Sequence, residues 1–320
     1  AILVDANLNN ANFKNADFRN VILHDTPLHN VILIGANLSG VNLSGVDLTN
    51  VLLKAPENSH PNLSGQDFSG KDLSGINMSA KDLSFSILTN VDLSGKDLTG
   101  ANLAGSFLFG TTLAGSDLSY TNLPYAYLSG KDLTGTILKG SDLSYANLDG
   151  VDLSGKDLTG TILRGSDLSG KDLTGTILRE SHLSYANLDG VDLSGKDLTG
   201  TILRAVHLAN VDLSGVDLSG KDLSYTTLTN VDLSGKDLTS TKFDYAKLEG
   251  ANLENTNLTD SSFVGTDLTL IKNKSLVDAD LSGASFAHSN LSDVNLSDAI
   301  LDRTNFWKAD LSAQDFTVAY

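Results

Sequence analysis

VDLSG KDLTG TILRG SDLSG, residues 151–170, places a leucine at every fifth position and repeats the same kinds of neighbour around it. From Leu3 to Leu268 this fifth position holds Leu, Phe or Met at 53 of 54 places, with Asn58 the exception. After three extra residues the spacing resumes at Leu276 and runs to Phe316. We call these positions the beat residues. A five-residue period fits neither a strand nor a helix, so the chain must turn once in every pentapeptide.

The residues around each beat indicate how it turns. Two positions before the beat comes a small residue such as Ala6 or Val151, and one position before it comes Asp or Asn, as in Asp152. Two positions after the beat Gly is frequent, as in Gly155. Gly accepts the backbone dihedrals of tight corners. Each pentapeptide is therefore predicted to be one short strand and one corner, with the beat residue and the small residue pointing inward.

A longer internal repeat sets the number of corners per coil. Residues 131–164 recur at 171–204 with differences only at positions 139, 140 and 142. This shift of 40 residues is eight beats, which must be a whole number of coils if equivalent residues are to stack. Two beats cannot enclose a core, and eight would leave a void that one ring of leucines cannot fill. Four pentapeptides per coil is the favoured arrangement, and it predicts an all-β solenoid of about 16 coils, at ~4.8 Å per coil.

The repeat resembles the pentapeptide-repeat family, whose motif is Ala-(Asp/Asn)-Leu-x-x. The motif appears directly in Ala6-Asn7-Leu8, Ala101-Asn102-Leu103 and Ala251-Asn252-Leu253. The resemblance covers the whole chain. It implies a right-handed quadrilateral β-helix with four pentapeptides per coil, here forming a single domain over residues 1–320.

Two places interrupt the pattern. Around residues 54–61 the beat residue is missing, yet the register resumes unshifted at Leu63, which predicts an outward loop in place of one side of a coil. Residues 269–275 add three residues between beats and predict a bulged corner that does not end the domain. The loop is interpreted either as a binding element or as a tolerated surface insertion.

Composition excludes several classes of protein. The 320 residues contain no Cys, so disulfides and thiolate metal sites are excluded. No apolar run approaches the ~18 residues of a membrane span, and no signal-peptide pattern is present. The sequence predicts a soluble protein of undefined compartment, extracellular if it forms a fibre and cytoplasmic if it acts on an intracellular target.

Folding four beats to a coil aligns the acidic residues. Of the 22 Asp that directly precede a beat residue up to Asp267, fifteen fall on two neighbouring sides of the predicted coil. One consecutive column, the acidic column, comprises Asp132, Asp152, Asp172, Asp192, Asp212 and Asp232. Stacked carboxylates repel one another by about 1 kcal/mol per pair even in bulk water. Lysines at the small inward position, such as Lys156, are expected to compensate by extending their ammonium groups among the Asp columns. A charge lattice that keeps the molecule in register is favoured over a cation-binding surface.

Aromatic residues align at one corner. Six occupy the position two after the beat on the same side, and we call them the aromatic strip: Phe85, Tyr125, Tyr145, Tyr185, Tyr225 and Tyr245. They are predicted either to stack and shield the corner or to bind a partner, because exposed Tyr supplies much contact area. Four outward isoleucines are expected to add apolar surface nearby: Ile137, Ile162, Ile177 and Ile202. The strip is the candidate binding site.

Enzymatic functions find no support in the pattern. The six His lack metal-ligand spacing, and the glycines recur as corners without the strand-to-helix transition of a phosphate loop. We therefore expect no catalytic residue, no metal, no cofactor and no small-molecule substrate.

The favoured function is a non-enzymatic structural rod that associates end to end with itself, or an interaction surface for another protein. The beat runs from Leu3 to Phe316, so open terminal coils are expected, and uncovered edges recruit strands. The alternative is an acidic mimic of DNA, as in family members that inhibit gyrase or confer fluoroquinolone resistance. The formal charge of −17 permits this alternative and makes nucleic acid itself an unfavourable ligand. An ice-binding surface is disfavoured by the charged Asp columns.

Overall fold

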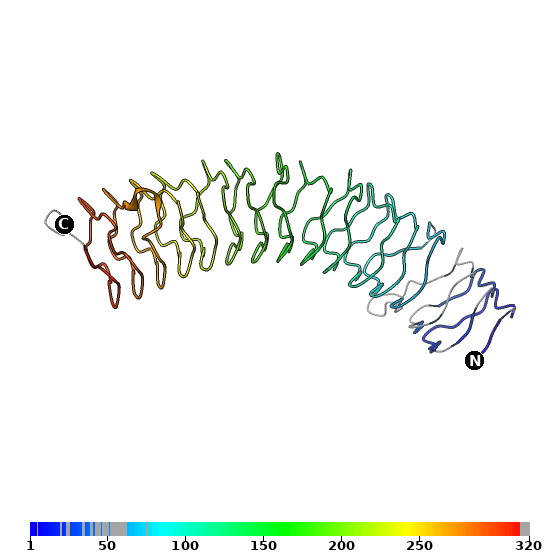
Figure 1. Ribbon diagram of the computed structural model, residues 1–320. Coiled ribbons are helices and arrows are strands. Elements are labelled where there is room, and N and C mark those ends of the chain that lie inside the picture. The colour runs from blue at the N-terminus through cyan, green and yellow to red at the C-terminus, as the bar shows by residue number, and fades with distance from the viewer. Residues whose placement is uncertain are drawn as a thin grey trace. The chain divides into compact units, whose positions relative to one another are not determined.

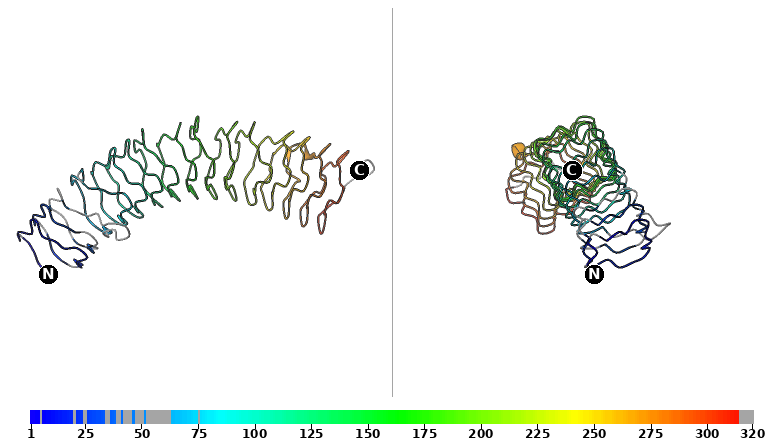
Figure 2. Two further views of the ribbon diagram at one scale, coloured as in Figure 1. Left: turned by 180° about the vertical axis from the view of Figure 1, so that it is seen from behind. Right: turned by 90° about the vertical axis from the view of Figure 1, so that its right-hand side faces the viewer.

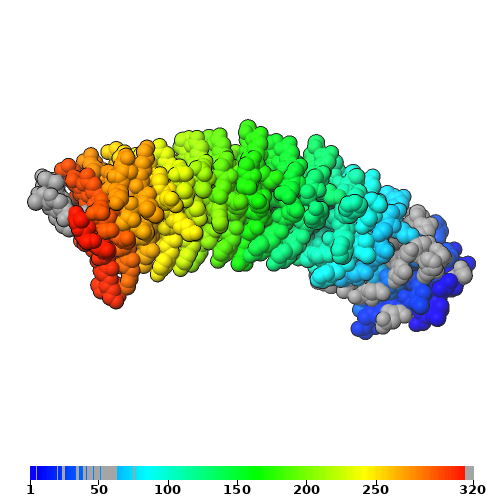
Figure 3. Space-filling view, viewed as in Figure 1, coloured from blue at the N-terminus to red at the C-terminus, as the bar shows by residue number. Residues whose placement is uncertain are grey.

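The computed structural model describes residues 1–313 apart from 5, 20, 24, 25, 34, 35, 39, 40, 42–45, 47–50, 52–62 and 75. The chain divides into two compact units, Ala1–Ile162 and Leu163–Tyr320. Within each unit the backbone winds through successive four-sided coils (Figures 1 and 2). In the space-filling view the coils within each unit follow one another in sequence order (Figure 3).

Parallel pairing joins residues that lie 20 positions apart. In the first unit Asn102 pairs with Asn122, and in the second Asp192 pairs with Asp212. Twenty residues are four pentapeptides, so the predicted four-beat coil is confirmed. Each pairing is an isolated bridge at the residue just before a beat, because the chain turns again after every pentapeptide. The total of about 16 coils stays a prediction.

The beat residues form the core, as predicted. Leu98, Leu158 and Leu183 are fully buried, and the small inward residue Ala101 is fully buried as well. In the second unit, beat phenylalanines stack along the core, with ring centroids 4.9 Å apart for Phe243 and Phe263 and 5.0 Å apart for Phe263 and Phe286. These side chains stack because successive coils, 20 residues apart at Phe243 and Phe263 and 23 residues apart at Phe263 and Phe286, place equivalent beats above one another.

The corners are closed by turns that need positive φ. The carbonyl of Leu98 accepts a hydrogen bond from the Ala101 amide at 2.9 Å, and Gly100 between them has φ 66°. The third residue of this turn, Gly100, lies in the left-handed region, which Gly adopts without steric cost. This explains why Gly is frequent two residues after the beat.

The expected register change falls at the three extra residues. Before it Asp237 pairs with Asn257, 20 residues on, whereas Asn257 pairs with Asp280, 23 residues on. The short 3-10 turn η1, Lys272–Lys274, takes up the difference, and 20-residue pairing returns between Ser275 and Asn295. The loop predicted at residues 54–61 lies outside the described residues, and the single-domain organisation stays a prediction.

Within the part of the chain that the structure describes, no helix combines the length and the apolar character needed to cross a bilayer.

Candidate interaction surface

In the first unit the aromatic strip lies on the surface. Phe85 and Tyr125 are 67% and 71% exposed, and Tyr145 is 41% exposed. The rings of Tyr125 and Tyr145 stack at a centroid distance of 5.2 Å and an interplanar angle of 7°. The predicted stacking is therefore present, but the rings still face solvent, so stacking shields the strip only in part.

The second unit repeats the arrangement with added cations. Tyr225 and Tyr245 stack at 5.2 Å and 16°. The Arg204 guanidinium lies 4.9 Å from the centre of the Tyr225 ring and 3.7 Å from a carboxylate oxygen of Asp222. Such cation–π contacts contribute about 0.5–1 kcal/mol at exposed sites. Arg204 therefore holds the Tyr225 ring in place beside an ion pair.

All six strip residues occupy corner positions with φ between 55° and 63°. A non-Gly side chain in this region costs roughly 1–2 kcal/mol, so an aromatic ring is an unexpected choice there. The rings lean onto the next coil: a Cβ added at Gly105 would lie 2.8 Å from the Phe85 ring, and one at Gly265 would lie 2.4 Å from the Tyr245 ring. Tyr120 does the same above Gly140 at another corner, so leaning alone does not define the strip.

Three exposed aromatic residues beside the strip were missed by the sequence analysis. Phe107 and Tyr127 are each 62% exposed and Phe109 is 75% exposed. They lie on the side that follows the strip corner, where Phe107 pairs with Ile87 of the preceding coil. The available signal was their departure from the repeat, because Phe107 and Tyr127 replace the usual Asp or Asn before a beat.

The four isoleucines expected near the strip divide between two sides. Ile162 and Ile202 pair with Asp142 and His182 on the side that precedes the strip corner. Ile137 instead pairs with Asp117, on a side that does not border the strip, and Ile177 follows it two coils later. The expectation that all four extend the strip was therefore wrong for Ile137 and Ile177.

The acidic column is organised by local turns. In the first unit the Asp132 carboxylate accepts the Thr134 amide at 2.8 Å, and in the second the Asp192 carboxylate accepts the Ser194 amide at 2.8 Å. The side-chain and backbone hydrogen bonds of these neighbours lower the pKa of both carboxyl groups below the usual range. Asp152, Asp172, Asp212 and Asp232 make the same contact with the residue two positions on.

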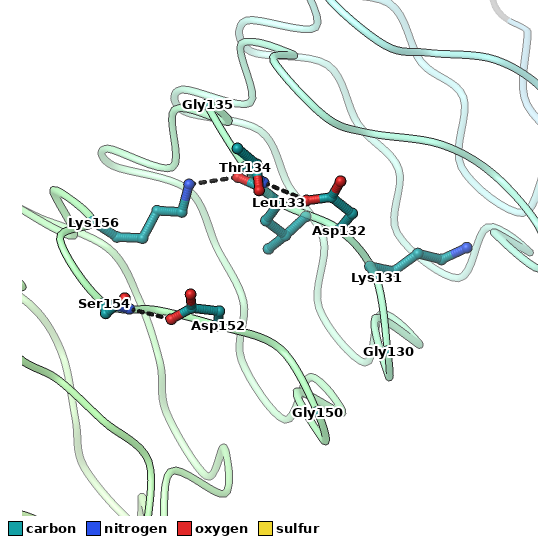
Figure 4. Close-up of a pocket in the computed structure, with 10 residues that line it drawn as sticks. All are labelled: Gly130, Lys131, Asp132, Leu133, Thr134, Gly135, Gly150, Asp152, Ser154 and Lys156. Atoms are coloured by element: carbon teal, nitrogen blue, oxygen red, sulfur yellow. Dashed lines mark hydrogen bonds between the residues drawn. The ribbon is translucent and has the colours of Figure 1, made fainter.

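The inward lysines point to a different partner from the one predicted. The Lys196 ammonium donates to the carbonyl oxygens of Leu173 and Thr176 at 2.6 and 3.2 Å. The Lys156 ammonium donates in the same way to the carbonyl oxygen of Thr136 and to that of Leu133, the contact drawn in Figure 4. The lysine side chain is long enough for its ammonium to reach backbone carbonyls of the preceding coil. The Asp carboxylates instead accept the backbone amide of the residue two positions further along the chain. Burial lowers the pKa of Lys156, and the negative charges of Asp152 and Asp132 oppose this with a smaller raising effect.

The lysines open depressions between coils. On the side bearing Lys131, the lysine ammonium donates a hydrogen bond to the Thr111 carbonyl at 2.9 Å. On another side of the coil, the carbonyl of Ala101, which holds the same repeat position as Thr111, instead accepts the backbone amide of Asn122. A depression of about 420 Å³ lies between Lys131 and Lys156 (Figure 4). An equivalent one of about 300 Å³ lies between Lys171 and Lys196.

Within the described part of the chain, neither these depressions nor the histidines assemble a metal centre. Among the described residues no group of three or more His, Cys, Asp or Glu is placed to hold an ion. His182 contacts the Ser184 hydroxyl at 3.1 Å. The binding role assigned to the aromatic strip and to the acidic column stays a prediction.

The coil geometry and the surface described above define a right-handed quadrilateral β-helix that displays side chains from regular sides. The family model described as pentapeptide repeats matches the chain in twelve overlapping segments that together cover most of residues 1–317. The chain belongs to the pentapeptide-repeat family, whose members are generally structural or interaction proteins.

Solved structures of this family are similar to the chain. HetL, involved in heterocyst differentiation regulation in the cyanobacterium Nostoc sp., is 30% identical over 73% of this chain and 86% of its own, with a TM-score of 0.23. Rfr23 from the cyanobacterium Cyanothece is 26% identical over 45% and 88%, with a TM-score of 0.19. Full-length QnrB1, a plasmid-mediated fluoroquinolone resistance protein, is 18% identical over 69% and 88%, with a TM-score of 0.18. No curated protein matches the sequence.

Proposed function

We propose that this protein is a non-enzymatic interaction scaffold that binds a protein partner through its aromatic strip. The observation that carries the proposal is the placement of six aromatic side chains at corners where Gly is the usual residue, all between 41% and 71% exposed. Residues held in an unfavourable backbone region are concentrated at functional sites. The core gains nothing from these rings, because they point away from it.

The chemistry of the strip suits protein recognition. Tyr presents a large ring and a polar hydroxyl with few rotatable bonds, which makes it common among the residues that dominate binding energy at interfaces. In each unit two of the strip rings stack on one another, Tyr125 on Tyr145 and Tyr225 on Tyr245, at 5.2 Å in both cases. A partner would therefore meet side chains whose conformational entropy is already reduced.

Site-specific photo-crosslinking in the producing cell tests this function. A photoreactive phenylalanine at position 125 is compared with one at position 120, because Tyr120 is also an exposed aromatic corner residue, at 64%, but lies outside the strip. We expect protein adducts from position 125 and few from position 120. Equal adduct patterns from the two positions would contradict the proposal.

End-to-end self-association is a separate proposal that rests on the stacked coils, because uncovered strand edges recruit further strands. Electron microscopy of concentrated protein should show filaments, and dispersed particles alone would contradict it. The DNA-mimic alternative also stays a prediction. One net charge per ~4 Å of predicted coil stack is sparse beside one per ~1.7 Å for duplex DNA, so we expect no inhibition in a gyrase supercoiling assay.

A further inference from the structure

The first unit carries a continuous uncharged aromatic surface, which we call the aromatic face: Phe85, Phe107, Phe109, Tyr125 and Tyr127, each at least 62% exposed. These side chains come from three consecutive coils. They occupy the strip corner and the side that follows it. Phe85 leans on the next coil at Gly105, and the pairing of Ile87 with Phe107 links the first two coils on that side.

The aromatic face is almost free of charge in a strongly acidic protein. Residues 81–90, 101–110 and 121–130 form the two sides that meet at the strip corner, and their charged residues are Asp82 and Lys81, of which Lys81 is buried. The intervening stretches 91–100, 111–120 and 131–140 form the other two sides and hold seven charged residues, among them Asp92, Asp117 and Asp132. Charge and aromatic surface are thus segregated onto opposite sides of the same coils.

The size of the aromatic face matches a macromolecular contact. Taking about 200 Å² for an aromatic side chain, the five residues expose on the order of 650 Å². Monomeric proteins seldom expose contiguous apolar patches this large, and a standard protein interface buries about 800 Å² on each partner. Half-buried Ile87, Ala104 and Pro124 adjoin the face and extend its apolar area.

We propose that the aromatic face is the contact surface of a homodimer, in which it packs against the same face of a second copy of this chain. This inference rests on the proposed function and names its partner. A two-fold contact brings the same patch of both copies together. The regular sides of a β-helix are flat, and flat sheet faces pack about 10 Å apart with side chains between them.

The charge distribution favours a second copy in this orientation. Two chains that each carry a formal charge of −17 repel one another. Contact through the aromatic face turns the sides bearing Asp92, Asp117 and Asp132 outward on both copies, where the carboxylates are far apart and hydrated. Contact through any of those acidic sides would instead bring carboxylate columns together.

The repeat itself supplies a replacement that keeps the fold. The triple variant Phe107→Asn, Phe109→Thr, Tyr127→Asn installs residue types that other coils carry at the same positions, as at Asn187 and Thr229. Tyr120→Gly is the matched control, because it removes an equally exposed aromatic ring from another corner. Phe109→Asp is a second test variant that places one charge in the face without touching the core.

Sedimentation equilibrium of the full chain tests the proposal. At about 100 µM we expect the wild type and Tyr120→Gly to sediment at twice 33.7 kDa. The triple variant and Phe109→Asp should each weaken dimerisation at least tenfold, with circular dichroism unchanged. Raising NaCl from about 50 to 500 mM should tighten the wild-type dimer, because salt screens the repulsion between the copies.

A wild type that stays monomeric at this concentration would overturn the homodimer. A triple variant with the wild-type dimerisation constant would overturn the assigned surface. Neither result removes the proposed function, because cross-linking from position 125 to a different protein would still support a scaffold that binds another partner. Absence of any cross-link from position 125, to a second copy or to another protein, would instead contradict the proposed function.

Discussion

The ammonium group of Lys196 lies 2.6 Å from the carbonyl oxygen of Leu173, which precedes it by 23 residues. Inward threonines make the same connection: the hydroxyl of Thr201 donates to the carbonyl of Leu178 at 3.0 Å, also 23 residues earlier. Lys and Thr at the inward position are therefore equivalent as donors that tie one coil to the preceding one. The lysine differs in lining a depression at the surface, together with Lys171 of the preceding coil.

Two substitutions of Lys196 test its role as a hydrogen-bond donor between coils. In Lys196→Met the Leu173 carbonyl loses its donor, and we expect local opening of the two coils to become easier by about 1.5–3 kcal/mol, since hydrogen bonds to charged groups contribute roughly that much. Lys196→Thr keeps a donor and should stay within about 0.5 kcal/mol of the wild type. Amide hydrogen exchange around residues 173–196 measures both. Equal protection in the two variants would argue against the donor role.

The carboxyl group of Asp92 provides a pH test. Its pKa is lowered from 3.8 to about 2, first by the Thr112 hydroxyl and then by the amide and hydroxyl of Ser94. The ionised group therefore stabilises the fold above the unfolded pKa, and this contribution is lost as the pH falls from about 4 through about 2. Thr112→Val should raise the pKa of Asp92 toward 3.8 in a carbon-13 NMR titration. Thr134→Val, in another coil, should leave it unchanged, and an equal rise in both would contradict the assignment.

The stacked phenylalanines of the second unit predict a graded loss of stability. Phe263 is fully buried between Phe243 and Phe286. Phe263→Ala should destabilise the surrounding coils by about 3–5 kcal/mol, because it removes buried surface and leaves a cavity. Phe263→Leu restores the commonest beat residue and should cost clearly less. Limited proteolysis across residues 240–290 distinguishes the variants, and similar cleavage of both would contradict this grading.

A corner substitution tests how the strip is supported. A Cβ at Gly265 would meet the Tyr245 ring at 2.4 Å, whereas one at Gly235 would meet nothing within 4 Å. Both positions have positive φ, so both Ala variants should lose roughly 1 kcal/mol from backbone strain. Only Gly265→Ala should also displace Tyr245 from its stack on Tyr225. Near-ultraviolet circular dichroism reports this displacement, and identical spectra for the two variants would contradict the close packing of ring and corner.

The sequence was sufficient for the features that depend on period alone. The five-residue beat and the 40-residue repeat predicted four pentapeptides per coil, and therefore which residues stack, including Tyr125 on Tyr145. The sequence was insufficient where a side chain contacts backbone atoms. The ammonium of Lys156 was expected among the Asp side chains, but the carbonyl oxygens of the preceding coil lie closer and carry no signature in the residue pattern.

The aromatic face was missed for a different reason. Phe107, Phe109 and Tyr127 form no continuous column, so aligning equivalent positions across all coils does not reveal them. They become visible only when the corner and the adjoining side of neighbouring coils are considered together. A search for departures from the polar consensus at outward positions would have found all three.

Photo-crosslinking in a strip-deficient chain tests the central claim most directly. The photoreactive residue stays at position 125, and Phe85, Tyr145, Tyr185, Tyr225 and Tyr245 are all replaced by Asn, which tolerates positive φ at corners such as Asn90. The strip account predicts an unchanged circular dichroism spectrum and at least tenfold less protein adduct than the parent chain gives. Undiminished adduct from a correctly folded variant would show that the aromatic strip does not bind the partner.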